Sequence, residues 1–193
     1  MSTTVVHPTL WGIFVGEHGN ELEALNSKSG PFPPQSDTEG YIAIGWADVG
    51  NMWMYKDQYN DFVNKFRICW PDYKNEVAFK TAANMVWNFA FEIKIGDYII
   101  SPSAASGYLL IGEVIGNYES DHGSWTKVAQ VKTRADLMHL RRVKWLHAIP
   151  KNDPRYNALH RIGQLTVCQP DITVAKLLGI ANNQVGVSGQ SIP

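Results

Sequence analysis

The sequence predicts an α+β fold in which helices flank a twisted β-barrel. Strand-like apolar segments occur near the start and in the second half of the chain, and two segments with helical periodicity lie between them. Glycine, proline and serine separate these segments, as expected for turns. With 45% hydrophobic and 18% charged residues, the 193-residue chain has enough apolar material for a folded core, which excludes a disordered chain. Strands and helices segregated in this way favour the α+β class.

The first half of the chain is expected to hold two strands and two helices. The strands are residues 10–15 (LWGIFV) and 40–46 (GYIAIGW), separated by a loop over 26–39 that is rich in Pro, Ser and Gly. Apolar side chains recur at helical spacing in residues 59–66 and again in 77–89. Either Asp72 or Asn75 is expected to cap the second helix.

Three further strands are expected in the second half, at residues 97–101 (DYIIS), 108–114 (YLLIGEV) and 140–146 (LRRVKWL). Because successive side chains of a strand alternate between its faces, the last strand should divide its residues into two sets. Arg141, Val143 and Trp145 share one face, and Arg142 and Lys144 share the other. A short helix is expected over 171–178, with Gly179 ending it. Residues 1–180 are then one domain, and 181–193 a flexible tail or linker.

Cysteine usage and the N-terminus predict a soluble, cytoplasmic protein. The two cysteines, Cys69 and Cys168, cannot form a disulfide framework, and Cys69 on the apolar face of a helix is interpreted as a buried structural thiol. No apolar run approaches the ~18 residues that span a bilayer, and the first residues lack the pattern of a signal peptide. We therefore expect no membrane partner.

Charge is distributed unevenly along the chain. Residues 1–121 carry 7 basic and 15 acidic side chains, whereas residues 122–161 carry 9 basic and 2 acidic ones. The basic segment includes Lys132, Arg134, Arg141, Arg142 and Lys144. A basic segment in an overall neutral chain is compatible either with a phosphate-binding face or with an ordinary solvated surface.

Motifs for catalysis and cofactor binding are largely missing from the sequence. The six histidines are not at zinc-ligand spacing, and the chain has neither a P-loop nor a dinucleotide-binding fingerprint, so no cofactor is expected. One catalytic pattern remains as an alternative. Asp72 followed by Glu92 and Lys94 satisfies the loose PD…ExK spacing of metal-dependent nucleases, in which two carboxylates hold Mg²⁺ against the scissile phosphate.

Aromatic residues give the stronger functional signal. Several lie in or beside expected strands: Trp11, Trp46, Trp53, Tyr118 and Trp145. An extruded or single-stranded base is recognised by stacking on such rings and by hydrogen bonds to its edge, although each ring can equally belong to the core. Trp46 is the best candidate for a pocket wall, because it ends a strand and is followed by small or polar residues, Asp48 among them, that are typical of a pocket rim.

The order of four segments resembles the PUA-like superfamily, particularly its EVE- and YTH-like branch and the N-terminal modules of McrB- and Mrr-type modification-dependent restriction proteins. The segments are residues 11–15 (WGIFV), 42–46 (IAIGW), 96–102 (GDYIISP) with 111–114 (IGEV) and Tyr118, and 139–145 (HLRRVKW). The resemblance implies a twisted β-barrel with an aromatic pocket for a modified base. The chain departs from that pattern by a long helical insertion over 47–91 and a long segment over 119–138.

Carried over by position, the resemblance implies roles for individual residues. Trp46 and Trp11 would be walls of the pocket, and Ser101 and Tyr118 would border it and donate hydrogen bonds. Arg141, Arg142 and Lys144 would contact phosphates.

The sequence therefore predicts a non-catalytic module that flips a modified base, most naturally of DNA, into an aromatic pocket as the specificity part of a restriction or defence system. An effector nuclease or NTPase would reside in a separate domain or partner. The alternatives are the metal-dependent nuclease and a module of the same fold that binds modified RNA.

Overall fold

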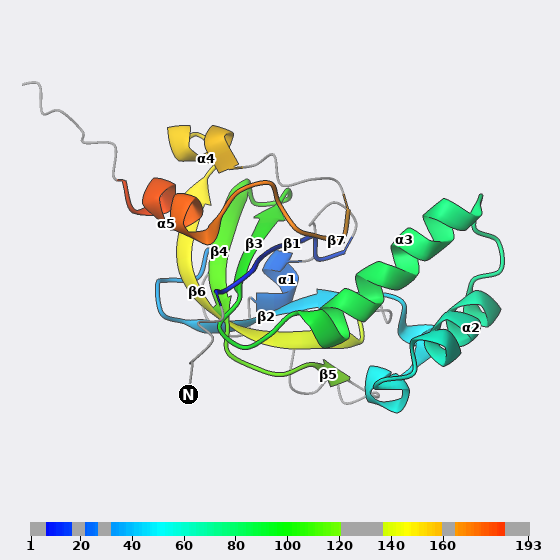
Figure 1. Ribbon diagram of the computed structural model, residues 1–193. Helices are drawn as coiled ribbons and strands as arrows, with labels where there is room; N and C mark the ends of the chain where they lie inside the picture. Colours follow the sequence, from blue (N-terminus) through cyan, green and yellow to red (C-terminus); the bar gives the residue numbers. More distant parts are fainter. Residues whose placement is uncertain (1–6, 17–21, 27–31, 121–136, 160–164, 184–193) are drawn as a thin grey trace, which may run out of the picture.

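Strands from both ends of the chain form one mixed β-sheet that curls into a half-barrel (Figure 1). The structure, a computed structural model, describes residues 7–16, 22–26, 32–120, 137–159 and 165–183. Its strands are β1 (Leu10–Ile13), β2 (Glu39–Ile44), β3 (Tyr98–Ser103), β4 (Tyr108–Val114), β5 (Glu119–Ser120), β6 (His139–Pro150) and β7 (Val167–Cys168). Their order is β2-β6-β4-β3-β1-β7, and β5 also pairs with β6. Strands β1 and β3 are parallel, whereas the other pairs are antiparallel. The α+β class is thus confirmed.

Helices cover both faces of this sheet. They are α1 (Leu22–Asn26), η2 (Ala47–Val49), η3 (Met52–Tyr55), α2 (Tyr59–Cys69), α3 (Glu76–Trp87), η4 (Asn88–Glu92), α4 (Pro154–Leu159) and α5 (Val174–Asn182). Figure 1 shows α2 and α3 extending from one side of the sheet, with α4 and α5 on the other side. The element η4 is a π-helical turn that continues α3. Asn75 caps α3, as the sequence allowed, because its side chain accepts a hydrogen bond from the amide of Ala78 at 2.9 Å.

Strand periodicity assigns the core residues to two clusters, one on each face. Ile99 of β3 and Leu110 of β4 belong to the larger cluster, which includes the aromatic side chains of α2 and α3. Ile100 and Leu109, their neighbours in sequence, belong to the smaller cluster with α4 and α5. Since alternate residues of one strand are buried on opposite faces, the apolar run at the centre of each strand has no polar side chain between its members.

Several local predictions differ from the structure. Gly179 does not end its helix, since α5 continues to Asn182 and buries Ala181 against the smaller cluster. The rest of the expected tail, from residue 184, lies outside the described residues. Cys69 is only half-buried, and its thiol contacts the carbonyl oxygen of Asp48 at 3.3 Å. Among the residues described, no helix has both the length and the apolar character needed to cross a membrane.

Candidate functional site

An open groove of about 510 Å³ lies at the turn between α2 and α3. It is lined by Cys69, Trp70, Pro71, Asp72, Tyr73, Lys74 and Ala78. We call it the aromatic groove. Trp70 and Tyr73 are half-buried, and both rings pack on the buried ring of Phe66, with centroid distances of 4.7 and 6.0 Å. The groove therefore combines two supported aromatic walls with the exposed carboxylate of Asp72 and the exposed ammonium of Lys74.

The structure places two of the predicted pocket residues against this groove. The indole nitrogen Nε1 of Trp46 donates a hydrogen bond to the hydroxyl of Tyr73 at 3.1 Å. Asp48 follows Trp46 by two residues, and its backbone carbonyl oxygen accepts a hydrogen bond from the Cys69 thiol. Two residues that line the groove thus contact the segment that follows β2.

Trp46 adopts an unusual backbone conformation. Its φ of 67° and ψ of 40° put a bulky residue in the left-handed region, which costs about 1–2 kcal/mol. Such strain persists only where the surrounding structure holds the residue in place. Here the side chain is held by Tyr73, and the carbonyl oxygen lies 3.2 Å from Nε2 of His139.

His139 links Trp46 to Tyr118 through a directional series of hydrogen bonds. The Met52 amide donates to the Tyr118 hydroxyl at 3.2 Å, and that hydroxyl lies 2.8 Å from Nδ1 of His139. The series is complete when the hydroxyl donates to Nδ1 and the Nε2–H of a neutral His139 donates to the Trp46 carbonyl. His139 is fully buried, and burial raises the pKa of Tyr118, so the Tyr118 hydroxyl keeps its proton at pH 7.

The remaining predicted pocket residues do not line the aromatic groove. Tyr118 is buried, and its hydroxyl contacts His139, which in turn contacts the carbonyl oxygen of Trp46. Ser101 has no exposed surface, and its hydroxyl donates to the carbonyl of Ile13 at 2.6 Å. Trp11 is 3% exposed and donates through Nε1 to Asp97 at 2.9 Å. The pocket expected from the sequence is therefore not assembled as one cavity from these side chains.

Trp11 instead lines a second, more polar groove of about 580 Å³ between β1, α3 and β7. Its wall from α3 and η4 carries Thr81, Asn84 and Asn88, which share one helical face. Sequence reasoning missed Trp70 and Tyr73 of the aromatic groove. The available signal was the segment 70–74 (WPDYK), where a Pro-Asp pair interrupts a helical pattern between two aromatic residues.

The predicted phosphate-binding residues divide between the surface and the core. Arg142 and Lys144 are half-exposed on β6 and form ion pairs with Glu119 at 3.4 Å and Glu113 at 3.7 Å. Lys132 and Arg134 lie outside the described residues. Arg141 has only 3% of its surface exposed and points to the opposite face from Arg142, so it cannot share a phosphate contact with that residue.

The guanidinium of Arg141 is bound by backbone carbonyls. It donates to Phe89 at 2.7 Å, to Ala90 at 2.8 Å and to Gly116 at 3.3 Å. Two of these carbonyls belong to η4, where a π-helical turn leaves them without helical partners. Burial lowers the pKa of Arg141 to about 10, so the side chain remains a cation at neutral pH.

The nuclease residues are not brought together. Asp72 lies before the first turn of α3, whereas Glu92 follows its last turn, and the intervening helix of 12 residues is about 18 Å long. Lys94 donates to the carbonyl oxygen of Phe91. Among the described residues, no group of three or more His, Cys, Asp and Glu side chains is placed to hold a metal ion. One metal ion therefore cannot bind Asp72 and Glu92 together in this structure.

A family model described as "Domain of unknown function (DUF8426)" matches residues 30–169, which is more than half of the chain. The chain therefore belongs to this family, and the matched region contains the aromatic groove and most of the sheet. Neither the curated proteins nor the solved structures include a match.

Proposed function

We propose that this member of a family without an established function is a non-catalytic module that binds nucleic acid and accepts one modified base in the aromatic groove. The observation that carries the proposal is the pair of half-exposed rings, Trp70 and Tyr73, with the strained Trp46 hydrogen-bonded to one of them. The curled sheet with helices on both faces supports a PUA-like fold, as the resemblance of four sequence segments implies.

Groove volume and chemistry suit a planar heterocycle. A volume of about 510 Å³ lies within the range of small-molecule pockets, and two aromatic walls provide stacking surface. At its rim, Asp72 can accept a hydrogen bond from the edge of a base and Lys74 can donate one. A methyl group buried there contributes about 1 kcal/mol, which is roughly a fivefold preference for the methylated base.

General affinity would come from the half-exposed cations of β6. Arg142 and Lys144 pair with carboxylates at the surface, and such exposed pairs are worth only about 0–1 kcal/mol. Replacing the carboxylate partner by a phosphate therefore costs little free energy. The counterions released from the nucleic acid make binding dependent on salt. Cleavage or translocation would be performed by a separate domain or partner.

The proposal is tested by fluorescence anisotropy at fixed salt. One duplex is offered in unmodified, 5-methylcytosine, 5-hydroxymethylcytosine and N6-methyladenine forms, with a matching RNA set. We expect one modified form to bind about fivefold tighter than the unmodified one. A tighter RNA form would identify the modified-RNA alternative.

Variants then locate the preference within the chain. Trp46→Ala and Tyr73→Ala should abolish the preference and leave the weak, salt-dependent binding, whereas Tyr73→Phe keeps the ring and should retain most of it. Ile95→Ala is the control, because Ile95 is exposed and does not line the groove. Equal binding of every probe, or a preference that survives both alanine variants, would overturn the assignment of the groove.

A further inference from the structure

Four rings form a continuous row at the end of α3 nearer the sheet. Tyr59 contacts Trp87 with centroids 4.9 Å apart, Trp87 contacts Phe91 at 4.5 Å, and Phe91 contacts Trp53 at 6.0 Å. We call these four residues the aromatic row. Trp53 is 46% and Tyr59 37% exposed, and the other two are half-buried, so the row reaches the surface.

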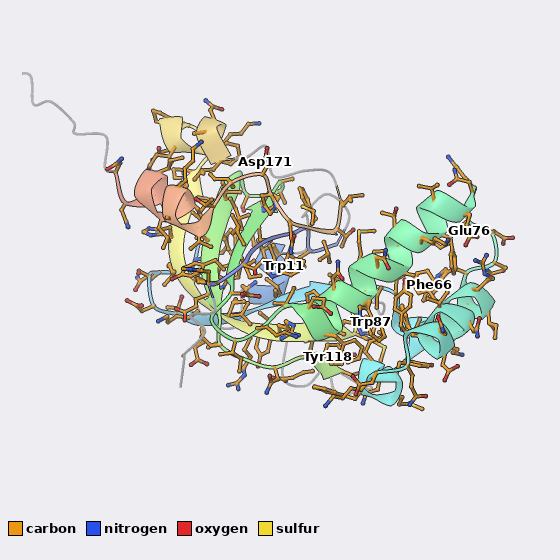
Figure 2. The ribbon with its side chains drawn as sticks, viewed as in Figure 1. Trp11, Phe66, Glu76, Trp87, Tyr118 and Asp171 are labelled. Carbon is orange, nitrogen blue, oxygen red and sulfur yellow. The ribbon has the colours of Figure 1, made fainter. Side chains whose placement is uncertain are left out.

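The aromatic row is separate from the aromatic groove. The groove adjoins the N-terminal end of α3, whereas Trp87 is the last residue of that helix, about 18 Å away. Figure 2 shows Trp87 and Tyr118 near the sheet, with Glu76 at the far end of the helix. A strand bound at both places would span several nucleotides.

Polar contacts hold the exposed rings in fixed orientations. The indole Nε1 of Trp53 donates to the carbonyl of Tyr118 at 3.3 Å, and the hydroxyl of Tyr59 donates to the side-chain oxygen of Asn84 at 2.5 Å. Neighbouring rings meet edge to face, at 88° for Tyr59 and Trp87 and 74° for Trp53 and Phe91. Because the rings are already ordered, a ligand that stacks on them loses little side-chain entropy.

A cation contacts the row at one end. The ammonium of Lys94 donates to the carbonyl oxygen of Phe91, which places a positive charge at the backbone of that residue. Arg142 lies on the opposite face of β6 from Arg141, whose guanidinium binds carbonyls of η4, so Arg142 is not placed at the row. Lysine is depleted from the cores of protein interfaces, whereas rings interleaved with basic side chains are typical of single-strand nucleic-acid sites.

We propose that the aromatic row binds single-stranded nucleic acid, with bases stacked on Trp53 and Tyr59 and with Lys94 contacting a phosphate. The inference rests on the proposed function, because the strand bound here is the one whose modified base enters the aromatic groove. It adds a second contact that is indifferent to modification, since every base has a face that can stack.

The test separates stacking from phosphate contact by the choice of probe. Binding is measured by anisotropy with a labelled oligothymidylate of about a dozen nucleotides and with an abasic strand of equal length. Trp53→Ala should weaken binding of the oligothymidylate between roughly fivefold and a hundredfold and leave binding of the abasic strand unchanged. Trp53→Phe should retain most of the affinity, and Lys94→Ala should flatten the salt dependence for both strands.

Ile68→Ala is the matched control, because Ile68 is 74% exposed on α2 outside the row. Circular dichroism of each variant establishes that it is folded. Unchanged oligothymidylate binding in both Trp53→Ala and Tyr59→Ala would overturn the role of the row, as would equal binding of the base-bearing and abasic strands.

These experiments distinguish failure of the inference about the aromatic row from failure of the proposed function. If Tyr73→Ala loses a base preference while Trp53→Ala keeps full strand affinity, the role of the aromatic groove is supported and that of the aromatic row is refuted. If no probe shows a base preference but Trp53→Ala loses strand affinity, the role of the row is supported and that of the groove is refuted.

Discussion

Replacing Arg141 with methionine should destabilise the protein because it leaves three buried backbone carbonyls without a donor. Methionine restores much of the apolar volume but has no N–H group to offer. A buried polar group without a partner costs about 1–3 kcal/mol. The bonds to Phe89 and Ala90 are short, at 2.7 and 2.8 Å, whereas the bond to Gly116 is long, at 3.3 Å. Counting mainly the two short bonds, we expect a loss of about 3 kcal/mol.

The adjacent residue provides the control. Arg142 is half-exposed and forms a surface ion pair with Glu119, so Arg142→Met should change the free energy of unfolding by less than about 1 kcal/mol. Urea denaturation followed by tryptophan fluorescence measures both variants, with the difference taken from the midpoint at constant m.

The same two variants should differ in their effect on nucleic-acid binding. Well below the midpoint of unfolding, Arg141→Met should keep the wild-type salt slope, whereas Arg142→Met should reduce that slope by about one. The reasoning is refuted if Arg141→Met unfolds within about 0.5 kcal/mol of wild type, since the carbonyls would then have other partners. A flatter dependence of affinity on salt for Arg141→Met would instead mean that Arg141 contacts a phosphate.

Four further predictions follow from the packing, and urea denaturation tests each. A Cβ at Gly40 would lie 2.2 Å from a side-chain oxygen and 2.3 Å from an indole nitrogen, so Gly40→Ala should cost about 1–3 kcal/mol or more. Gly179→Ala should instead stabilise by about 0.5–1 kcal/mol, because no atom is near the new methyl group within α5; a loss of stability there would contradict the helical assignment. Asp97→Ala should cost about 3 kcal/mol, since the carboxylate accepts from three N–H groups at 2.8–2.9 Å, and a near-neutral result would mean that water replaces it. Arg155 lowers the pKa of Asp153 below its ordinary 3.8 through side-chain and backbone hydrogen bonds, so Asp153→Asn should remove stability that is present at pH 7 and lost as the pH falls through the lowered pKa. A difference between wild type and Asp153→Asn that persists unchanged at pH 2 would argue against this pair.

Local periodicity was sufficient to locate most elements of the sheet and the two long helices. The alternation in residues 140–146 separated Arg141, Val143 and Trp145 from Arg142 and Lys144, and the structure confirms that division. Periodicity could not show that an arginine on the buried face has partners. Those partners exist because η4 is a π-helical turn whose carbonyls face β6, which depends on how α3 ends against the sheet.

Predictions from local sequence were wrong where tertiary packing determines the end of an element. Gly179 was expected to end a helix, but α5 extends three residues further because Leu177 and Ala181 are buried in the smaller cluster. Tertiary burial outweighs the small helical penalty of one glycine.

The sequence by itself determined the α+β class and narrowed the cap of α3 to Asp72 or Asn75. It also placed Trp46 near the end of a strand, although β2 ends two residues earlier, at Ile44. Only the tertiary structure decided what surrounds Trp46. Its indole meets Tyr73, 27 positions away, and its carbonyl meets His139, 93 positions away. Periodicity and propensity depend on neighbours within a few residues, whereas a groove depends on how whole elements pack. For that reason Trp70 and Tyr73 line the groove, while Trp11 and Ser101, equally suggestive in sequence, are buried in the core.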